Sequence, residues 1–63
     1  MTSQLARYEE IARRMTTEKI RYALADVNAT LQIWRDRPIT DPYIEKLYAE
    51  KDAFVYELQR RGL

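Results

Sequence analysis

The sequence predicts an all-α protein built around an antiparallel helical hairpin, residues about 17–36 and 41–61. Apolar residues recur every three or four positions through both segments, which is the period of an amphipathic helix. The one convincing interruption is residues 37–42, which hold both prolines of the chain. The rest is rich in strong helix formers such as Ala, Leu, Glu and Arg. We therefore expect a single helical domain over residues 1–63.

The N-terminal residues 4–16 also show a helical pattern, but their apolar patch is rotated by about 120° from that of residues 20–34, at 100° per residue. If one helix runs from about 4 to 36, it has two apolar faces. The second face would be covered by another copy of the chain, and this homodimer is the interpretation that we favour. The predicted interface residues are Tyr8, Ile11, Met15, Tyr22 and Ile33. The alternative is a bend at Thr16-Thr17 that folds the N-terminal helix onto its own hairpin.

The two hairpin helices each present one apolar stripe. The first stripe, with steps of four and three residues, is Ile20, Leu24, Val27, Leu31 and Trp34. The second is Ile44, Leu47, Tyr48, Phe54, Val55 and Leu58, with Lys51 as an interruption. Because equal helices joined by a short loop pack antiparallel, the two stripes should meet, with Trp34 and Phe54 in one core.

The second hairpin helix has clear end signals. Thr40 or Asp41 suits the N-cap position, where a side-chain oxygen accepts a free backbone N–H, and Pro42 suits the first turn. Ile39 and Ile44 have the spacing of a hydrophobic staple. At the other end, Gly62 suits a left-handed C′ residue, Leu63 would fold back on Leu58, and Glu57 and Arg61 are spaced as an i,i+4 ion pair.

Composition excludes several classes of function. The chain has no Cys and no His, so we expect no disulfide and no zinc site, and it has no Gly-containing acidic loop for calcium. No phosphate-binding loop or nucleophile–base pair is present, so we predict no cofactor, no catalytic residue and no enzymatic activity. A core of this size is marginal by itself, which favours self-association or docking on another protein.

Charge and hydropathy bear on the partner and the location. The net charge is +1 and acidic residues neutralise most of the Arg residues, so nucleic acid is a possible partner that we do not favour. No apolar run approaches the ~20 residues that span a bilayer, and no signal peptide is visible, so we expect a cytoplasmic protein without membrane contact. Aromatic and Arg side chains are enriched in protein interfaces. The predicted partner contacts are Arg35, Arg37, Tyr43 and Tyr56.

Three stretches of the chain, Thr-Ser-Gln at 2–4, Glu-Glu-Ile-Ala-Arg-Arg at 9–14 and Pro-Ile-Thr-Asp-Pro-Tyr at 38–43, give it a whole-chain resemblance to a known group. It resembles the short early accessory proteins of lambdoid bacteriophages that are encoded between the exonuclease and excisionase genes. The resemblance implies a small intracellular regulator of phage development or host physiology.

The prediction for function is therefore a small non-enzymatic protein-interaction module, a phage accessory regulator that binds a host or phage protein in the host cytoplasm. One alternative is a nucleic-acid-associated regulator that uses surface Arg residues. Another is a structural subunit of a larger helical assembly.

Overall fold

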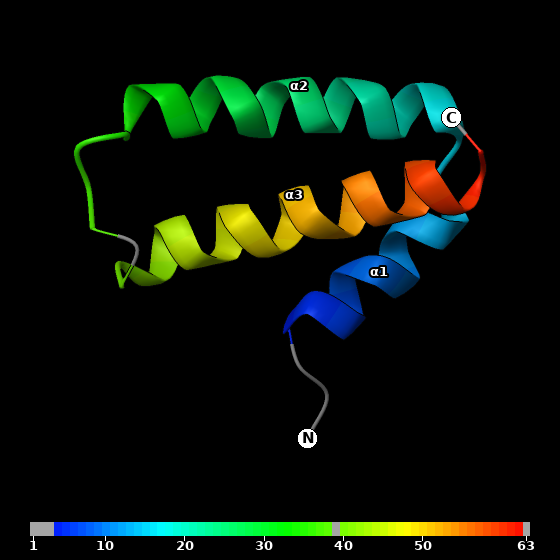
Figure 1. Ribbon diagram of the computed structural model, residues 1–63, viewed down its shortest axis with the longest axis horizontal. Coiled ribbons are helices and arrows are strands. Elements are labelled where there is room, and N and C mark those ends of the chain that lie inside the picture. The colour runs from blue at the N-terminus through cyan, green and yellow to red at the C-terminus, as the bar shows by residue number, and fades with distance from the viewer. Residues whose placement is uncertain (1–3, 39, 63) are drawn as a thin grey trace.

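The structure, a computed structural model, describes residues 4–38 and 40–62 and holds three helices in that part of the chain (Figure 1). They are α1 (Gln4–Arg14), α2 (Thr17–Ile33) and α3 (Pro42–Arg60). Helices α2 and α3 form the antiparallel hairpin, and α1 lies beside the C-terminal part of α3. The all-α prediction and the hairpin are confirmed. Within the described residues, no helix is long and apolar enough to cross a bilayer.

The junction between α1 and α2 is a sharp corner. Thr16 has an extended backbone (φ −69°, ψ 154°), and its side-chain oxygen accepts the backbone N–H of Lys19 at 3.2 Å, so it caps α2. The favoured prediction of one helix from about 4 to 36 is therefore wrong, and the alternative bend at Thr16-Thr17 is confirmed. A helix that turns here gives up a few backbone hydrogen bonds, but it gains a cap and buries its apolar face on α3.

Helix α3 begins at Asp41, whose Oδ1 accepts the backbone N–H of Tyr43 at 2.9 Å, and Pro42 occupies the first turn. Of the two predicted caps, Asp41 is the one that the structure uses, while Thr40 makes no capping bond. The predicted staple involves Ile39, which lies outside the described residues.

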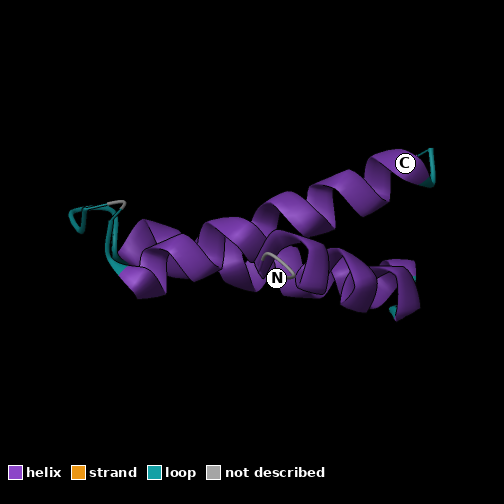
Figure 2. Cartoon of the chain, turned by 90° about the horizontal axis from the view of Figure 1, so that it is seen from below, coloured by secondary structure: helices purple, strands orange, loops and turns teal. Residues whose placement is uncertain are grey.

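The C-terminal end of α3 follows the predicted ending. Gly62 has φ of 80°, the left-handed region that glycine enters without a steric penalty. Its N–H donates to the carbonyl oxygen of Gln59 at 3.0 Å. The predicted contact of Leu63 with Leu58 involves a residue outside the described range. Seen from below, α3 is inclined relative to the other helices (Figure 2).

The core draws on all three helices. Its buried members are Ala12, Ile20, Val27, Ile44, Leu47 and Phe54, with Met15, Ala23, Leu24, Leu31 and Leu58 partly buried against them. Helix α3 is buried on two adjacent sides, because Ala53 and Glu57 are covered as well as Ile44, Leu47 and Phe54 of the predicted stripe. Tyr48, predicted within that stripe, is 41% exposed.

The prediction that Trp34 shares the core with Phe54 is wrong. Phe54 is 7% exposed, whereas Trp34 is 38% exposed and lies just after the last residue of α2. The guanidinium of Arg37 sits 4.5 Å from the centroid of the Trp34 ring. A cation over an aromatic face is favourable in partly solvated positions, so this stacking holds the ring at the rim of the hairpin.

Candidate interaction surfaces

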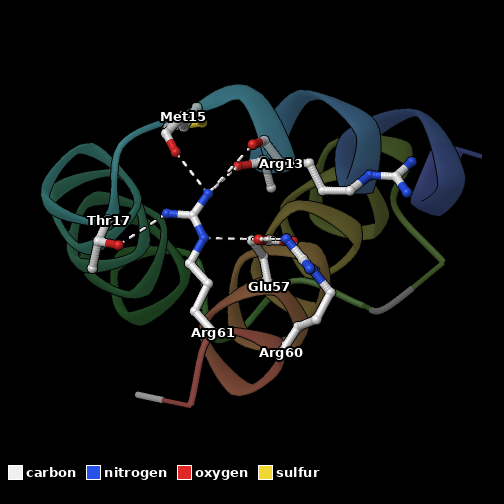
Figure 3. A network of polar contacts seen from close by, with 7 residues as sticks. Arg13, Met15, Thr17, Glu57, Arg60 and Arg61 are labelled. Atoms are coloured by element: carbon white, nitrogen blue, oxygen red, sulfur yellow. Dashed lines mark hydrogen bonds and ion pairs between the residues drawn. The ribbon is translucent and has the colours of Figure 1, made fainter.

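A cluster of polar side chains around one buried carboxylate joins the ends of the three helices (Figure 3). At its centre is Glu57, which is 1% exposed. Arg60 donates two hydrogen bonds to the Glu57 carboxylate, at 2.8 and 2.7 Å, and Arg61 donates a third at 2.8 Å. A buried carboxylate is tolerated only when it is paired and hydrogen-bonded, as Glu57 is.

Hydrogen bonds from Arg61 connect the cluster to the other two helices. Its Nη1 donates to the hydroxyl of Thr17 at 2.9 Å, at the start of α2. Its Nη2 donates to the carbonyl oxygens of Met15 at 2.7 Å and Ala12 at 3.2 Å, at the end of α1. These carbonyls belong to a helix end, where a cation compensates both the unpaired oxygens and the negative end of the dipole.

The electrostatics of the cluster are set by these contacts. The hydrogen bonds from Arg60, and then that from Arg61, lower the pKa of Glu57 from 4.5 to about 2, although burial acts in the opposite direction. The same contact with Glu57 raises the pKa of Arg60. Within the described residues, no buried side-chain nitrogen or oxygen atom lacks a hydrogen-bond partner, and Arg61 links the cluster to the other two helices. We assign the cluster a structural role, which is to fix α1 against the C-terminal end of α3.

The sequence predicted only part of this cluster. The Glu57–Arg61 spacing identified an ion pair, and the structure confirms it at 2.8 Å. The burial of Glu57 was not predicted, because that side of α3 is covered only when α1 folds back. The signal that could have found it is the position of Glu57 one turn from Ala53, on a side of the helix with small side chains.

The placement of α1 leaves the loop-side half of the hairpin uncovered by a third helix (Figure 1). A shallow groove of about 450 Å³ lies there between α2 and α3. Its lining residues are Asn28, Leu31, Gln32, Arg35, Tyr48 and Lys51. We call it the hairpin groove. Leu31 and Tyr48 supply its apolar surface.

The charge in the hairpin groove has one sign. Arg35 and Lys51 both line it, and no carboxylate does. Neither cation forms an ion pair within the described residues, whereas Lys46 on the same helix pairs with Glu50 at 3.9 Å. The groove therefore offers two uncompensated cations next to apolar surface. Such a surface is complementary to an anionic, partly apolar ligand.

The other predicted partner contacts are placed differently. Arg37 is not a free contact: besides stacking on Trp34, it donates to Asp41 Oδ2 at 3.0 Å and so ties the loop to the start of α3. The hydrogen bond from Tyr43 and then that from Arg37 lower the pKa of Asp41. Tyr43 and Tyr56 are 47% and 55% exposed, and neither lines the hairpin groove.

The five residues predicted for a dimer interface do not form one continuous face. Met15 packs against the core and Tyr8 is partly buried, because both lie on the side of the bend that faces α3. Ile11 is 47% exposed on α1. Tyr22 and Ile33 are 71% and 72% exposed, and both lie on α2.

Comparison with protein-family models, with curated proteins and with solved structures found no match to this chain.

Proposed function

We propose that this chain is a non-enzymatic protein-interaction module that binds an acidic amphipathic helix of another protein in the hairpin groove. The observation that carries the proposal is the composition of the groove, where Leu31 and Tyr48 stand next to the unpaired cations Arg35 and Lys51. Apolar contact provides the affinity in such a site, and the charges select the partner and its orientation.

The balance of buried and exposed apolar side chains supports a binding role. In the described part of the chain, the buried apolar residues number seven, and two of them are alanines. Eight large apolar side chains are exposed there: Leu5, Ile11, Tyr22, Ile33, Trp34, Tyr43, Tyr48 and Tyr56. A chain of 63 residues can bury only about 60% of its unfolded surface, so cover from a partner adds stability where the monomer has little.

The shape of the groove favours a helix as the ligand. Two antiparallel helices leave a furrow between them, and a third helix packs its side-chain ridges into such a furrow. An amphipathic helix would place apolar residues on Leu31 and Tyr48 and acidic residues near Arg35 and Lys51. The resemblance to short early phage accessory proteins, which implies a small regulator, agrees with this mode of action on a host or phage protein.

The test is a titration of the labelled protein with a synthetic amphipathic helix of Leu and Glu, followed by amide NMR shifts. We expect saturable shifts centred on Leu31 and Tyr48, and weaker binding of the counterpart peptide of Leu and Lys. Lys51→Glu should weaken binding of the acidic peptide about tenfold, because an attraction becomes a repulsion in a partly desolvated site.

Lys19→Glu is the matched control, because Lys19 is exposed on α2, outside the groove, and changes charge by the same amount. It should leave the affinity nearly unchanged. Equal weakening by Lys19→Glu and Lys51→Glu would mean that net charge, not the groove, attracts the peptide. Shifts that avoid Leu31 and Tyr48 would place the binding site elsewhere.

The nucleic-acid alternative has less support. Four of the Arg residues, Arg14, Arg37, Arg60 and Arg61, are engaged with carboxylates of their own chain. Phosphate contacts depend on cations that are free to replace counterions. A mobility shift with duplex DNA that weakens steeply with salt would favour this alternative over the protein-binding role.

A further inference from the structure

The outward side of α2 carries an apolar strip that nothing in the chain covers. The buried residues Ile20 and Val27 define the side that faces α3. On the opposite side, at steps of three, four and four residues, lie Tyr22, Ala25, Ala29 and Ile33, which we call the outer strip. Tyr22 and Ile33 are 71% and 72% exposed, and both alanines are exposed. The spacing is that of a contact line between two packed helices.

We propose that the outer strip is the contact with a second copy of this chain, in which the two α2 helices pack in parallel about a two-fold axis. The argument for a second copy is the charge beside the strip. Arg21 and Asp26 flank it on opposite sides, five residues apart in sequence. In a parallel helix pair, flanking positions with this spacing meet across the interface, so Arg21 of each copy faces Asp26 of the other.

Neither residue forms an ion pair within the described part of its own chain. The two-fold symmetry would satisfy both residues twice. In an antiparallel pair, each flank of the outer strip would instead face the equivalent flank of the second copy, so charges of the same sign would meet. Asp26 would approach Asp26 of the second copy, and Arg21 would approach the Arg35 flank. The spacing of Arg21 and Asp26 therefore favours the parallel orientation, in which Glu18, one turn before Tyr22 on the same line, also comes to lie near Glu18 of the second copy.

Helix α2 lies at one edge of the molecule, with α3 and α1 on the same side of it (Figure 1). Ala25 and Ala29 lie in the middle of the outer strip, and short side chains there allow two helix axes to approach closely. The rest of each molecule lies on the opposite side of α2, so the two bodies point away from each other. The contact covers about three helical turns, so it buries less surface than the roughly 1,200 Å² or more of a typical stable interface. The fraction of dimer should therefore depend on the protein concentration.

This contact lies next to the hairpin groove on α2, since Arg35 belongs both to one flank of the outer strip and to the lining of the groove, but it does not rest on the proposed function. Of the residues that the sequence predicts for a dimer interface, the outer strip includes Tyr22 and Ile33. It does not include Tyr8 and Met15, which turn toward α3.

Cross-linking tests the orientation directly, because the chain has no cysteine of its own. In the parallel dimer, residue 25 meets residue 25 and residue 29 meets residue 29. Ala25→Cys and Ala29→Cys should each form a disulfide-linked dimer under mild oxidation, since their Cα atoms come within bonding range. Gln59→Cys, exposed on α3, is the matched control and should stay monomeric. Cross-linking only in a mixture of the first two variants would show the antiparallel arrangement and overturn the proposal.

Sedimentation equilibrium tests the charge pair. Arg21→Glu and Asp26→Arg should each weaken the dimer about tenfold, because each removes two attractions and creates two repulsions. The double variant should return to within about threefold of the natural protein. A natural protein that is monomeric at about 1 mM, or a double variant no better than the singles, would overturn the proposal. Far-UV circular dichroism confirms that each variant stays helical, as exposed positions should.

Discussion

At the scale of single residues, Glu57 shows how hydrogen bonds can offset the cost of burying a charge in a very small protein. Its carboxylate is removed from water but accepts three hydrogen bonds from two guanidinium groups. A charged hydrogen bond is stronger than a neutral one, and each bond here favours the ionised form. The consequence is a coupling between folding and protonation.

The pH dependence of stability should reveal this coupling. The Glu57 carboxyl has a pKa of about 2 when folded and 4.5 as its ordinary value, so the unfolded chain binds more protons between these values. Its contribution to the free energy of unfolding is therefore complete above pH 4.5 and is lost as the pH falls toward 2. Urea denaturation of the natural protein and of Glu57→Gln, at steps from pH 6 to pH 2, measures it.

We expect the stability difference between the two proteins to be largest near pH 6 and to shrink through this window. The lowered pKa of Asp41 adds a slope of the same sign, which both proteins share and the difference removes. Glu10→Gln is the control, because Glu10 pairs with Arg14 at the surface, with 60% of its side chain exposed, and should change little. A stability difference that does not change with pH would mean that protonation of Glu57 does not contribute to the loss of stability in acid.

At the scale of elements, the decisive feature is the corner at Thr16. The residues on both sides of it favour helix, and their pattern is compatible with one long helix. Local signals alone therefore leave the choice open. Helix α1 ends at Arg14, Thr16 caps α2, and Arg61 donates to the carbonyl oxygens of Ala12, in the last turn of α1, and of Met15, just after it. Each of these contacts satisfies a backbone group that a helix end would otherwise leave unpaired.

Thr16→Ala should therefore lower the free energy of unfolding by about 1 kcal/mol, the usual cost of losing an N-cap side chain. Thr40→Ala is the matched control. Thr40 is exposed in the other connection and makes no capping bond, so it should change stability by less than about 0.5 kcal/mol. Chemical denaturation of both variants gives the comparison. Equal losses would mean that Thr16 does not act as a cap.

At the scale of the whole molecule, the protein combines a small apolar core with the polar cluster of Glu57, Arg60 and Arg61. The Cα atoms span 32 × 29 × 14 Å, so few side chains are covered on all sides. Helix α1 contacts mainly α3, and Arg61 hydrogen-bonds to Ala12 of α1, Thr17 of α2 and Glu57 of α3. A protein of this size has a free energy of unfolding of only a few kcal/mol, so the hydrogen bonds of Arg61 contribute a large share of that free energy.

Arg61→Ala should loosen α1 and lower the free energy of unfolding by at least about 2 kcal/mol, because it removes several hydrogen bonds to a charged donor. Arg60→Ala is the control: the contacts of Arg60 in this cluster end at Glu57, and its side chain is 53% exposed, so its loss should cost less. Thermal denaturation ranks the two variants, and amide exchange in α1 should rise more in Arg61→Ala. Equal exchange in both would mean that packing alone holds α1.

The sequence by itself determined the hairpin and most of its ends. The periods of residues 20–34 and 44–58, the two prolines and Gly62 are local signals, and the structure confirms the helices and the left-handed Gly62 that they predict. It also placed Tyr22, Ile33, Tyr43 and Tyr56 outside the two hairpin stripes, and all four are exposed on the chain.

Only the tertiary structure decided where α1 goes, and with it the burial of Glu57, the position of the hairpin groove and the loss of the long second face. Trp34 has the period of the core, yet it lies past the end of α2, where stacking on Arg37 competes with burial. The physical reason is the same in each case. Periodicity fixes which side of a helix is apolar, but contacts between residues 44 to 49 positions apart, such as those of Arg61, decide what covers it.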